Sequence, residues 1–185
     1  MRLNLGENVI NGLRSLVGEN QFEFLGYRVD LCSGDIRDSL KKAEPAKTVL
    51  GVIETVLCHY SSAKKVERVG QLTRFASLPG GQAYEKAFLT RAVQPIAYEF
   101  GKTPEKLVES ARLLGGVKRT YGDSAVELFS LPHVPLVIIL WEESVFPAEA
   151  SVLFDESASC YLPTEDLAVL GELTASRLVE AKLPT

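Results

Sequence analysis

Apolar residues recur at helical spacing in two stretches near the middle of the chain. In residues 47–60 they fall at i, i+3, i+4 and i+7, which predicts a helix with one buried face. Residues 84–100 carry a second apolar face that includes Phe88 and Ile96. Because proline lacks a backbone donor and its ring clashes with the preceding turn, Pro95 predicts a kink or a split in this second helix.

Two further helices are predicted from the residues at their ends. Thr103 suits an N-cap, Pro104 suits the first helical position, and Gly115-Gly116 suits the end of the same helix. The last helix is predicted to open at residues 162–166, where acidic side chains in the first turn interact favourably with the helix dipole.

Strands are predicted on either side of these helices. The pattern in residues 22–31, shifted at Gly26, predicts a strand pair or a bent strand. The uninterrupted apolar run at residues 136–141 predicts a central strand buried on both faces. The remaining predictions are a partner strand at 150–155, another strand at 126–131, and a loop or short strand at 72–79.

Together these elements predict the α+β class. Strands and helices are grouped along the chain and do not alternate as βαβ units. We expect a single globular domain over residues 1–185, with a mixed or antiparallel sheet and about four helices packed against it.

Composition narrows the class of protein. The longest apolar run, residues 134–141, is too short for a helix that crosses a bilayer, so no membrane span is expected. The first 17 residues lack the continuous apolar core of a secretory signal, which favours a cytoplasmic location. Cys32, Cys58 and Cys160 are widely separated, so we expect buried or inert thiols and neither a zinc site nor disulfides.

Charge is segregated along the sequence. Residues 1–119 hold 18 basic and 13 acidic side chains, whereas residues 120–176 hold ten acidic side chains and no Lys or Arg. An acidic region of this kind attracts cations or a basic protein partner. The isoelectric point near 5.3 argues against a surface that binds nucleic acid.

Candidate binding residues lie in two turns and at a strand end. His133 lies between Pro132 and Pro135, directly before the buried strand, where a side chain can be held rigidly. A glycine turn before a helix, as at Gly80-Gly81, can present backbone amides to an anion. We expect these segments to converge with the end of the central strand in a small-molecule pocket, although a strand-capping histidine and a plain turn are the simpler interpretations. The expected ligand-binding residues are His133, Trp141, Gly80, Gly81, Tyr84, Arg91 and His59.

A metal site is the alternative. Glu142, Glu143 and Asp155 lie at ends of two predicted strands, and clustered carboxylates bind magnesium or calcium. With His133 they would serve a metal-assisted hydrolase or transferase. The ordered ligand spacing of a calcium loop is missing, which favours a solvated acidic rim.

Three segments resemble, in order and spacing, an uncharacterised domain family of bacteria and archaea, many of them anaerobes. They read LPGGQAYEKAF, LPHVPLVIILWEES and FPAEASVLFDESASCYLPTEDL, and the resemblance covers about residues 48–178. Some relatives look fused to a small four-cysteine iron–sulfur domain similar to that of the corrinoid iron–sulfur protein. The resemblance implies cofactor or redox surroundings but no catalytic residue, and the three cysteines here match no such cluster motif.

The sequence therefore predicts a cytoplasmic domain of unknown function. We expect it to bind a small molecule or cofactor, or to act as an accessory domain in anaerobic metabolism. Which cofactor it binds, and whether it is an enzyme, are left open. A third interpretation is a homo-oligomer that associates through the acidic region.

Overall fold

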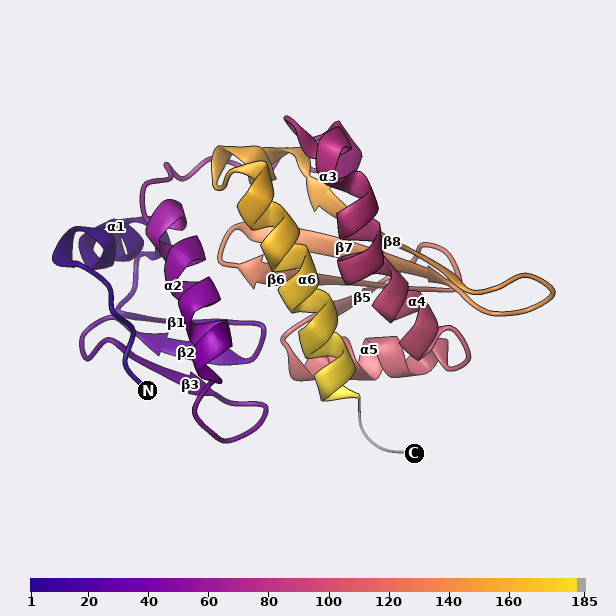
Figure 1. Ribbon diagram of the computed structural model, residues 1–185, viewed down its shortest axis with the longest axis horizontal. Coiled ribbons are helices and arrows are strands. Elements are labelled where there is room, and N and C mark those ends of the chain that lie inside the picture. The colour runs from indigo at the N-terminus through magenta and orange to yellow at the C-terminus, as the bar shows by residue number, and fades with distance from the viewer. Residues whose placement is uncertain (183–185) are drawn as a thin grey trace.

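The computed structural model describes residues 1–182 and has the predicted α+β architecture. The chain forms two antiparallel sheets, one of three strands and one of five. Figure 1 shows the smaller sheet with α1 (Glu7–Val17) and α2 (Lys47–Tyr60) at one end of the molecule. The range of α2 is the predicted one, whereas α1 is not predicted from the sequence.

The small sheet contains the predicted strand pair. Its strands in order are β1 (Gln21–Phe24), β2 (Tyr27–Asp30) and β3 (Asp35–Asp38). The turn between β1 and β2 has positive φ at both Leu25 (48°) and Gly26 (77°), the geometry of a tight two-residue hairpin turn. The prediction of a strand pair that turns at Gly26 is therefore confirmed, and β3 extends it by a strand that was not predicted.

The large sheet has the strand order β4-β8-β7-β6-β5. Its strands are β4 (Leu72–Arg74), β5 (Val117–Arg119), β6 (Ser124–Leu131), β7 (Val134–Trp141) and β8 (Glu149–Asp155). Every residue of β7 except its last is buried, as the uninterrupted apolar run predicts. The predicted pairing of β7 with β8 is also confirmed.

The second predicted helix is split at its proline. It begins at Gly81, earlier than expected, and consists of α3 (Gly81–Phe88), the π-helical segment η2 (Leu89–Val93) and α4 (Gln94–Phe100). Because Pro95 has no N–H to donate to the preceding turn, the wider π turn just before it absorbs the break in the hydrogen-bond ladder.

The last two helices, α5 (Pro104–Leu113) and α6 (Thr164–Ala181), begin where their end signals predict. Thr103 occupies the N-cap position, but its side chain makes no capping hydrogen bond. Helix α6 contacts η2, α4 and α5, so it joins the helical layer into one unit (Figure 1). None of the helices within residues 1–182 has the length and apolar character needed to cross a membrane.

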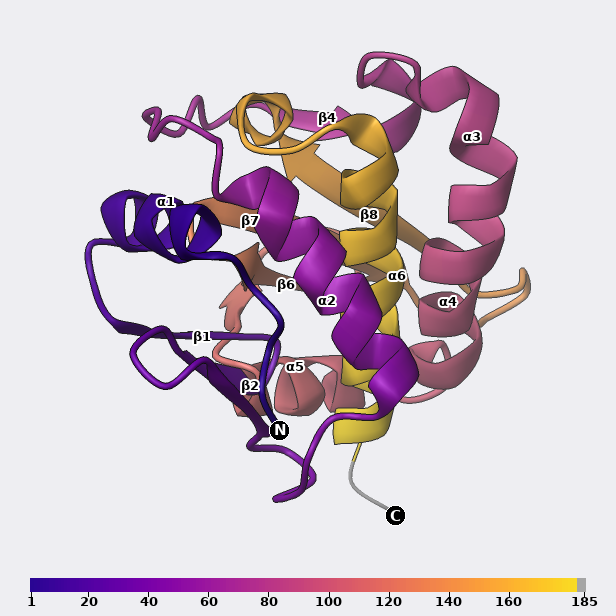
Figure 2. The ribbon, with the colours of Figure 1, turned by 60° about the vertical axis from the view of Figure 1, so that its left-hand side comes forward.

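One cluster of buried side chains connects both sheets with the helices. Figures 1 and 2 show that α3, α4 and α6 lie on the same face of the large sheet. On the opposite face a second, smaller cluster consists of Ala125, Val137 and Ile139, with Leu72 and Leu153 packed against it. All five residues belong to strands of the sheet itself, and no helix within residues 1–182 contributes to this cluster.

A buried arginine joins the last helix to the first sheet. The Arg177 side chain is only 1% exposed and donates two hydrogen bonds to the carboxylate of Asp38, of 2.8 and 2.7 Å. Its Nε donates to the carbonyl of Leu25, and its guanidinium lies 4.3 Å from the centre of the Tyr27 ring. The pKa of Asp38 lies below its usual value. Burial alone would raise it, but the hydrogen bonds from Arg177 and from backbone amides stabilise the charged carboxylate and have the larger combined effect.

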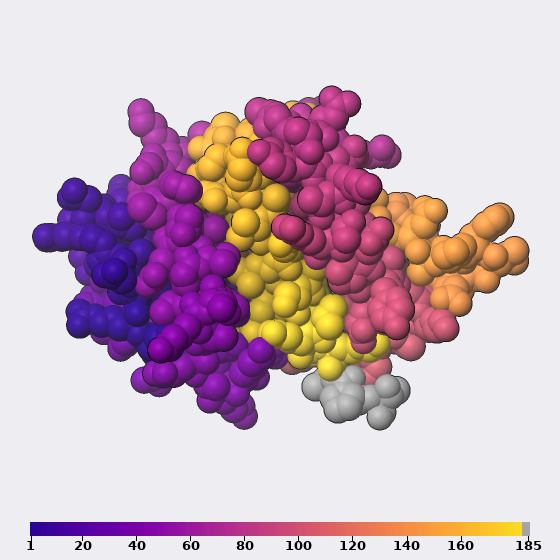
Figure 3. Space-filling model, viewed as in Figure 1, coloured from indigo at the N-terminus to yellow at the C-terminus, as the bar shows by residue number. Residues whose placement is uncertain are grey.

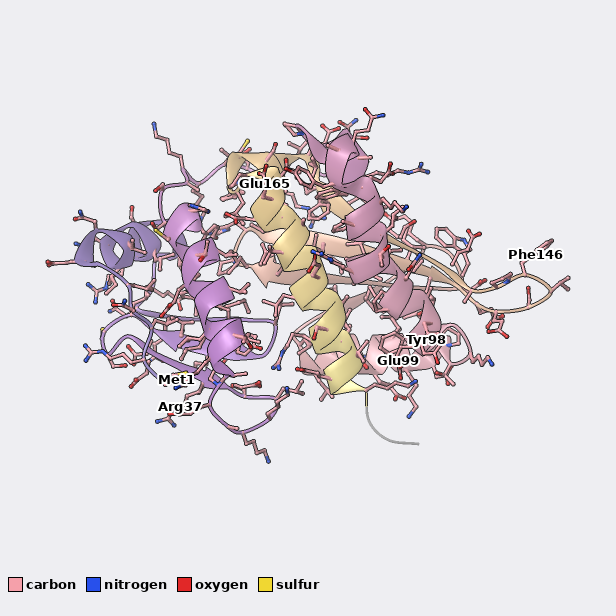
Figure 4. All side chains as sticks on the ribbon, viewed as in Figure 1. Met1, Arg37, Tyr98, Glu99, Phe146 and Glu165 are labelled. Carbon is pink, nitrogen blue, oxygen red and sulfur yellow. The ribbon has the colours of Figure 1, made fainter. Side chains whose placement is uncertain are left out.

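The loop between β7 and β8 stands out from the rest of the molecule (Figure 3). This arm, residues 142–148, carries Val145 and Phe146 at its tip, and both are largely exposed. Its base rests on the junction of α4 and α5, where the amide of Glu143 donates to the carbonyl of Gly101 (2.9 Å). Figure 4 places Phe146 at the far end of the arm.

Candidate functional site

The predicted convergence of His133 and Trp141 is wrong. His133 lies in the turn just before β7, whereas Trp141 is the last residue of that strand. Eight residues of strand at roughly 3.3 Å each separate them by about 26 Å, more than a small-ligand pocket spans. The error arises because a strand with a buried middle holds its two ends apart, and no loop folds back between them.

His133 has a local structural role at its end of the sheet. It has a positive φ of 68° in the two-residue turn that joins β6 to β7. Its Nε2 donates to the carbonyl of Leu16 (3.3 Å), and its ring stacks on Tyr161 with the ring centres 6.0 Å apart. These contacts connect the turn with α1 and with the segment just before α6. His133 therefore fits the interpretation that it caps the strand.

The other predicted ligand residues are dispersed. His59 of α2 donates from Nδ1 to Asp166 in the first turn of α6 (2.6 Å). Arg91 in η2 pairs at 3.5 Å with Glu172, further along α6. Each of these two pairs ties a neighbouring helical element to α6. Tyr84 is half exposed on α3.

The predicted carboxylate cluster is also wrong. In the β7–β8 hairpin Trp141 pairs with Glu149, whereas Leu136 pairs with Phe154. An antiparallel hairpin brings the end of its first strand next to the start of its second, so Glu142 and Glu143 lie at the opposite end of β8 from Asp155. No group of three or more metal-ligand side chains occurs within residues 1–182.

Asp155 is instead the anchor of a segment that crosses the end of the sheet. Its buried carboxylate accepts hydrogen bonds from Ser157 and from the amides of Val69 (3.1 Å) and Gly70 (2.7 Å). Burial raises the pKa of Asp155, but these donors outweigh it and keep the pKa below its usual value. Arg68 pairs with Asp155 at 3.3 Å and also with buried Glu127 of β6. The sequence gives no signal for this arrangement, because the partners of Arg68 lie about 60 and 90 positions away.

The three cysteines differ from expectation in exposure. All three thiols are free, as predicted for Cys32, Cys58 and Cys160. The expectation that they are buried is wrong, because each of the three is exposed.

Strand β8 has an open edge over half of its length. On the side away from β7 it pairs with β4, but β4 ends at Arg74, opposite Leu153. Beyond that point, residues 149–152 of β8 have no neighbouring strand on this side within the described chain. The chain turns away here because Phe75–Ser77 forms a short 3-10 helix, η1.

The backbone directions at this edge follow from a hydrogen bond at its paired end. Glu156 N donates to Gln71 O (2.9 Å), so Glu156 directs its backbone polar groups toward β4. These directions alternate in an antiparallel ladder, so Phe154 also faces β4 while Val152 and Ala150 face the open edge. The carbonyl of Val152 lies next to the N–H of Phe75, because the non-hydrogen-bonded pair Arg74–Leu153 is flanked by a bond at that position. The groups that face the open edge without a partner strand are therefore the N–H of Val152 and both backbone groups of Ala150.

An apolar groove lies beside the open edge. Its volume is about 300 Å³, and it separates residues 150–153 of β8 from the helical wall of α3 and η2. The apolar side chains of the wall are Phe75, Phe88, Leu89 and Val93. Leu89 is 42% exposed, although it lies among buried neighbours. Arg74 and Glu85 add one charge of each sign to the lining.

The Gly80-Gly81 turn shapes this wall without contacting a ligand itself. Gly80 has a φ of 75°, a conformation that favours glycine. Gly81 is buried so close to the carbonyl of Phe75 that any Cβ would collide with it. Two glycines in succession therefore allow α3 to start directly against η1, which positions Phe88 and Leu89 opposite β8. From the sequence, this double glycine was assigned to a pocket with His133 and Trp141, whereas neither glycine lines the groove that the turn shapes.

The chain matches the family described as Domain of unknown function (DUF3786) over residues 14–177. No curated protein and no solved structure matches it.

Proposed function

The chain belongs to the DUF3786 family of unknown function, and we propose that it is a binding domain that receives an extended segment of a partner protein along the open edge of β8. The observation that carries this proposal is the outward-facing N–H and C=O of Ala150, together with the N–H of Val152, beside the apolar groove. An extended peptide that adds to a strand edge gains main-chain hydrogen bonds, and side-chain pockets next to the edge give specificity.

The edge lacks the features by which sheets prevent unwanted pairing. Natural edge strands are protected by lysine, proline, bulges or a covering loop. Residues 150–153 of β8 read Ala-Ser-Val-Leu, pair with β7 without a bulge, and carry no charge. The unprotected edge of β8 lies beside the apolar side chains of α3 and η2, and this arrangement supports the proposal that a partner segment pairs with β8.

The groove accommodates two or three side chains of such a segment. Alternate residues of an extended peptide point to the same side, so one apolar side chain in two would contact Leu89 and Phe88. Arg74 and Glu85 lie in the lining and form no ion pair with each other within 4.0 Å, so both are available to polar groups of the peptide.

The family resemblance adds an expectation about the partner. We propose that the segment belongs to a cytoplasmic protein of cofactor or redox metabolism in an anaerobe. A basic partner suits the acidic stretch at residues 120–176, which includes β8 itself. A small molecule bound at this edge is a weaker proposal, because the groove is open and its most distinctive feature is a row of backbone groups.

The test is a selection of random peptides displayed on phage against the wild-type protein, followed by affinity measurements with synthetic copies. We expect peptides with alternating apolar residues and a Kd in the micromolar range. Ala150→Pro removes the outward-facing N–H without removing a bond to β7, so we expect binding to fall at least tenfold while the melting temperature changes little. Leu89→Asp places a charge in the groove and should weaken binding similarly.

Matched controls separate loss of the site from loss of the fold. Leu113 is as exposed as Leu89 but lies on α5, so Leu113→Asp should bind the selected peptides as the wild type does. Ser151 directs its N–H toward β7, so Ser151→Pro should lower the melting temperature strongly. Peptides that bind Ala150→Pro and Leu89→Asp with unchanged affinity, or a selection that yields no binding peptide, would contradict the proposal.

A further inference from the structure

Two arginines lie side by side on the solvent-facing side of the small sheet. Arg28 of β2 and Arg37 of β3 are directly opposite in the antiparallel register, and both are exposed. The Cβ atoms of such a pair are about 5 Å apart, and like charges at that distance are destabilising. The core does not require this pair, because the buried residues of these strands point to the other face of the sheet.

The positive charge here is only partly neutralised by the protein. Arg28 pairs with Glu23 at 2.6 Å. Arg37 has no acidic group within 4.0 Å among the described residues, and neither has Lys42 in the turn that follows β3. Arg37 and Lys42 therefore have no acidic partner within 4.0 Å among the described residues, and the third cation, Arg28, has one.

These three side chains line one open cavity. Its volume is about 580 Å³, and its lining also includes the side chain of Ser39. Figure 4 shows Arg37 next to Met1 at the outer edge of the small sheet, well away from the arm and from α4. The cavity is therefore separate from the groove beside β8.

Two of the three acids that line the cavity are already paired. Both carboxylate oxygens of Asp38 accept from buried Arg177, and Glu44 pairs with the amino group of Met1 at 3.0 Å. Asp35 is the third acid and lies about 7 Å along β3 from Arg37. An anion is consequently favoured at the end of the cavity formed by Arg37 and Lys42.

The backbone of Lys42 is strained at this position. Its φ is 52°, in the left-handed region that lysine rarely adopts. The turn is nevertheless fixed, because Asp38 pairs with Ala43 through two backbone hydrogen bonds and its carboxylate accepts from the amides of Leu40 and Lys41. Strain of this kind collects at ligand-binding turns, where the surrounding structure holds it in place.

We propose that this cavity binds a small molecule that carries a diphosphate or triphosphate group, whose charge is spread over enough oxygens to reach Arg28, Arg37 and Lys42 together. Two adjacent guanidinium groups match the oxygens of a phosphate in a forked geometry, and an ammonium group adds a point charge. The proposal goes beyond peptide binding at β8 and does not depend on it, since none of the residues that line the groove takes part.

The test uses isothermal titration of the full chain with inorganic phosphate, pyrophosphate and ATP at low salt. We expect pyrophosphate or ATP to bind in the micromolar range, with inorganic phosphate at least tenfold weaker. Arg37→Ala should weaken pyrophosphate binding at least tenfold, whereas Arg112→Ala should leave it unchanged, because Arg112 is an exposed arginine on α5.

A second variant tests the strained turn. Lys42→Gly removes the charge and relieves the left-handed backbone, so we expect weaker pyrophosphate binding together with a higher melting temperature. The proposal fails if the wild type binds neither pyrophosphate nor ATP below millimolar concentration. Equal losses in Arg37→Ala and Arg112→Ala would show non-specific attraction and would overturn it as well.

Discussion

At the residue scale, buried polar groups connect parts of the chain that are far apart in sequence. Arg177 and Asp38 are separated by 139 positions, and each is at most 3% exposed. The guanidinium also contacts Tyr27, whose pKa is raised to about 12 by burial. A charge buried in this way depends on its partner, since removal of either partner leaves the other charge without compensation.

Arg177→Met is therefore expected to be strongly destabilising. The free energy of unfolding should fall by about 3–5 kcal/mol, because Asp38 would remain buried and unpaired. Urea unfolding followed by circular dichroism measures the change. In Arg91→Met, which breaks a more exposed pair between η2 and Glu172 of α6, the loss should stay below about 1 kcal/mol. Similar losses in the two variants would refute this account of Arg177.

At the element scale, glycines decide how closely the helices pack. Gly171 in α6 lies against the ring of Phe88 from α3, and a Cβ there would overlap the ring. Gly51 in α2 has nothing within 4 Å of the position of a Cβ. Both are inside helices, so alanine improves the intrinsic helix propensity at each site, but only one site has room for it.

The two alanine variants should consequently change stability in opposite directions. Gly51→Ala is expected to raise the free energy of unfolding by about 0.5–1 kcal/mol through helix propensity alone. Gly171→Ala is expected to lower it by about 1–3 kcal/mol, because α3 has to move away from α6. Urea midpoints of the two variants and the wild type provide the comparison. Stabilisation by both substitutions would mean that Phe88 adjusts without cost.

Most elements were predictable because local chemistry specifies them. The spacing in residues 47–60, the end signals around Pro104 and the apolar run in β7 each depend on neighbouring residues only. Helix α1 was missed although Val9, Leu13 and Leu16 recur at helical spacing, and strand β3 was missed because four residues are too few for a clear alternation. The position of β4 beside β8 depends on contacts across about 80 residues, and no local pattern encodes it.

The candidate site was less predictable than the fold for the same reason. From the sequence, His133, Trp141 and the acidic residues were placed together because each lies near the end of a predicted strand. A sheet has two opposite edges at which strands end, and the pairing register decides which strand ends lie at the same one. The groove beside β8 exists because a three-residue strand stops early. The strand at 150–155, the loop or short strand at 72–79 and the double glycine at 80–81 were all predicted, but no local pattern shows that β4 ends before β8 does.

At the scale of the whole molecule, both sheets share one core. One cluster of buried side chains includes residues of both sheets and of α1 to α6. This supports the proposal of a single domain, since neither sheet buries its apolar face without the rest.

A single unfolding transition is therefore expected. Trp141 fluorescence reports on the large sheet, and hydrogen exchange of the amides in β1–β3 reports on the small one. In urea the two signals should give the same midpoint, because the sheets lose their common core together. A small sheet that unfolds at a lower urea concentration than the large one would indicate two independent units.

The buried Arg177 has a consequence for how the protein is made. A ribosome adds residues in order, so Asp38 and its hairpin leave the exit tunnel long before their partner in α6 has been synthesised. During that interval the first sheet has α1 and α2 beside it but lacks the large sheet and α6, so part of its apolar surface stays exposed and chaperones have a defined window in which to bind it. Nascent chains halted before residue 177 should accordingly remain sensitive to protease over their whole length.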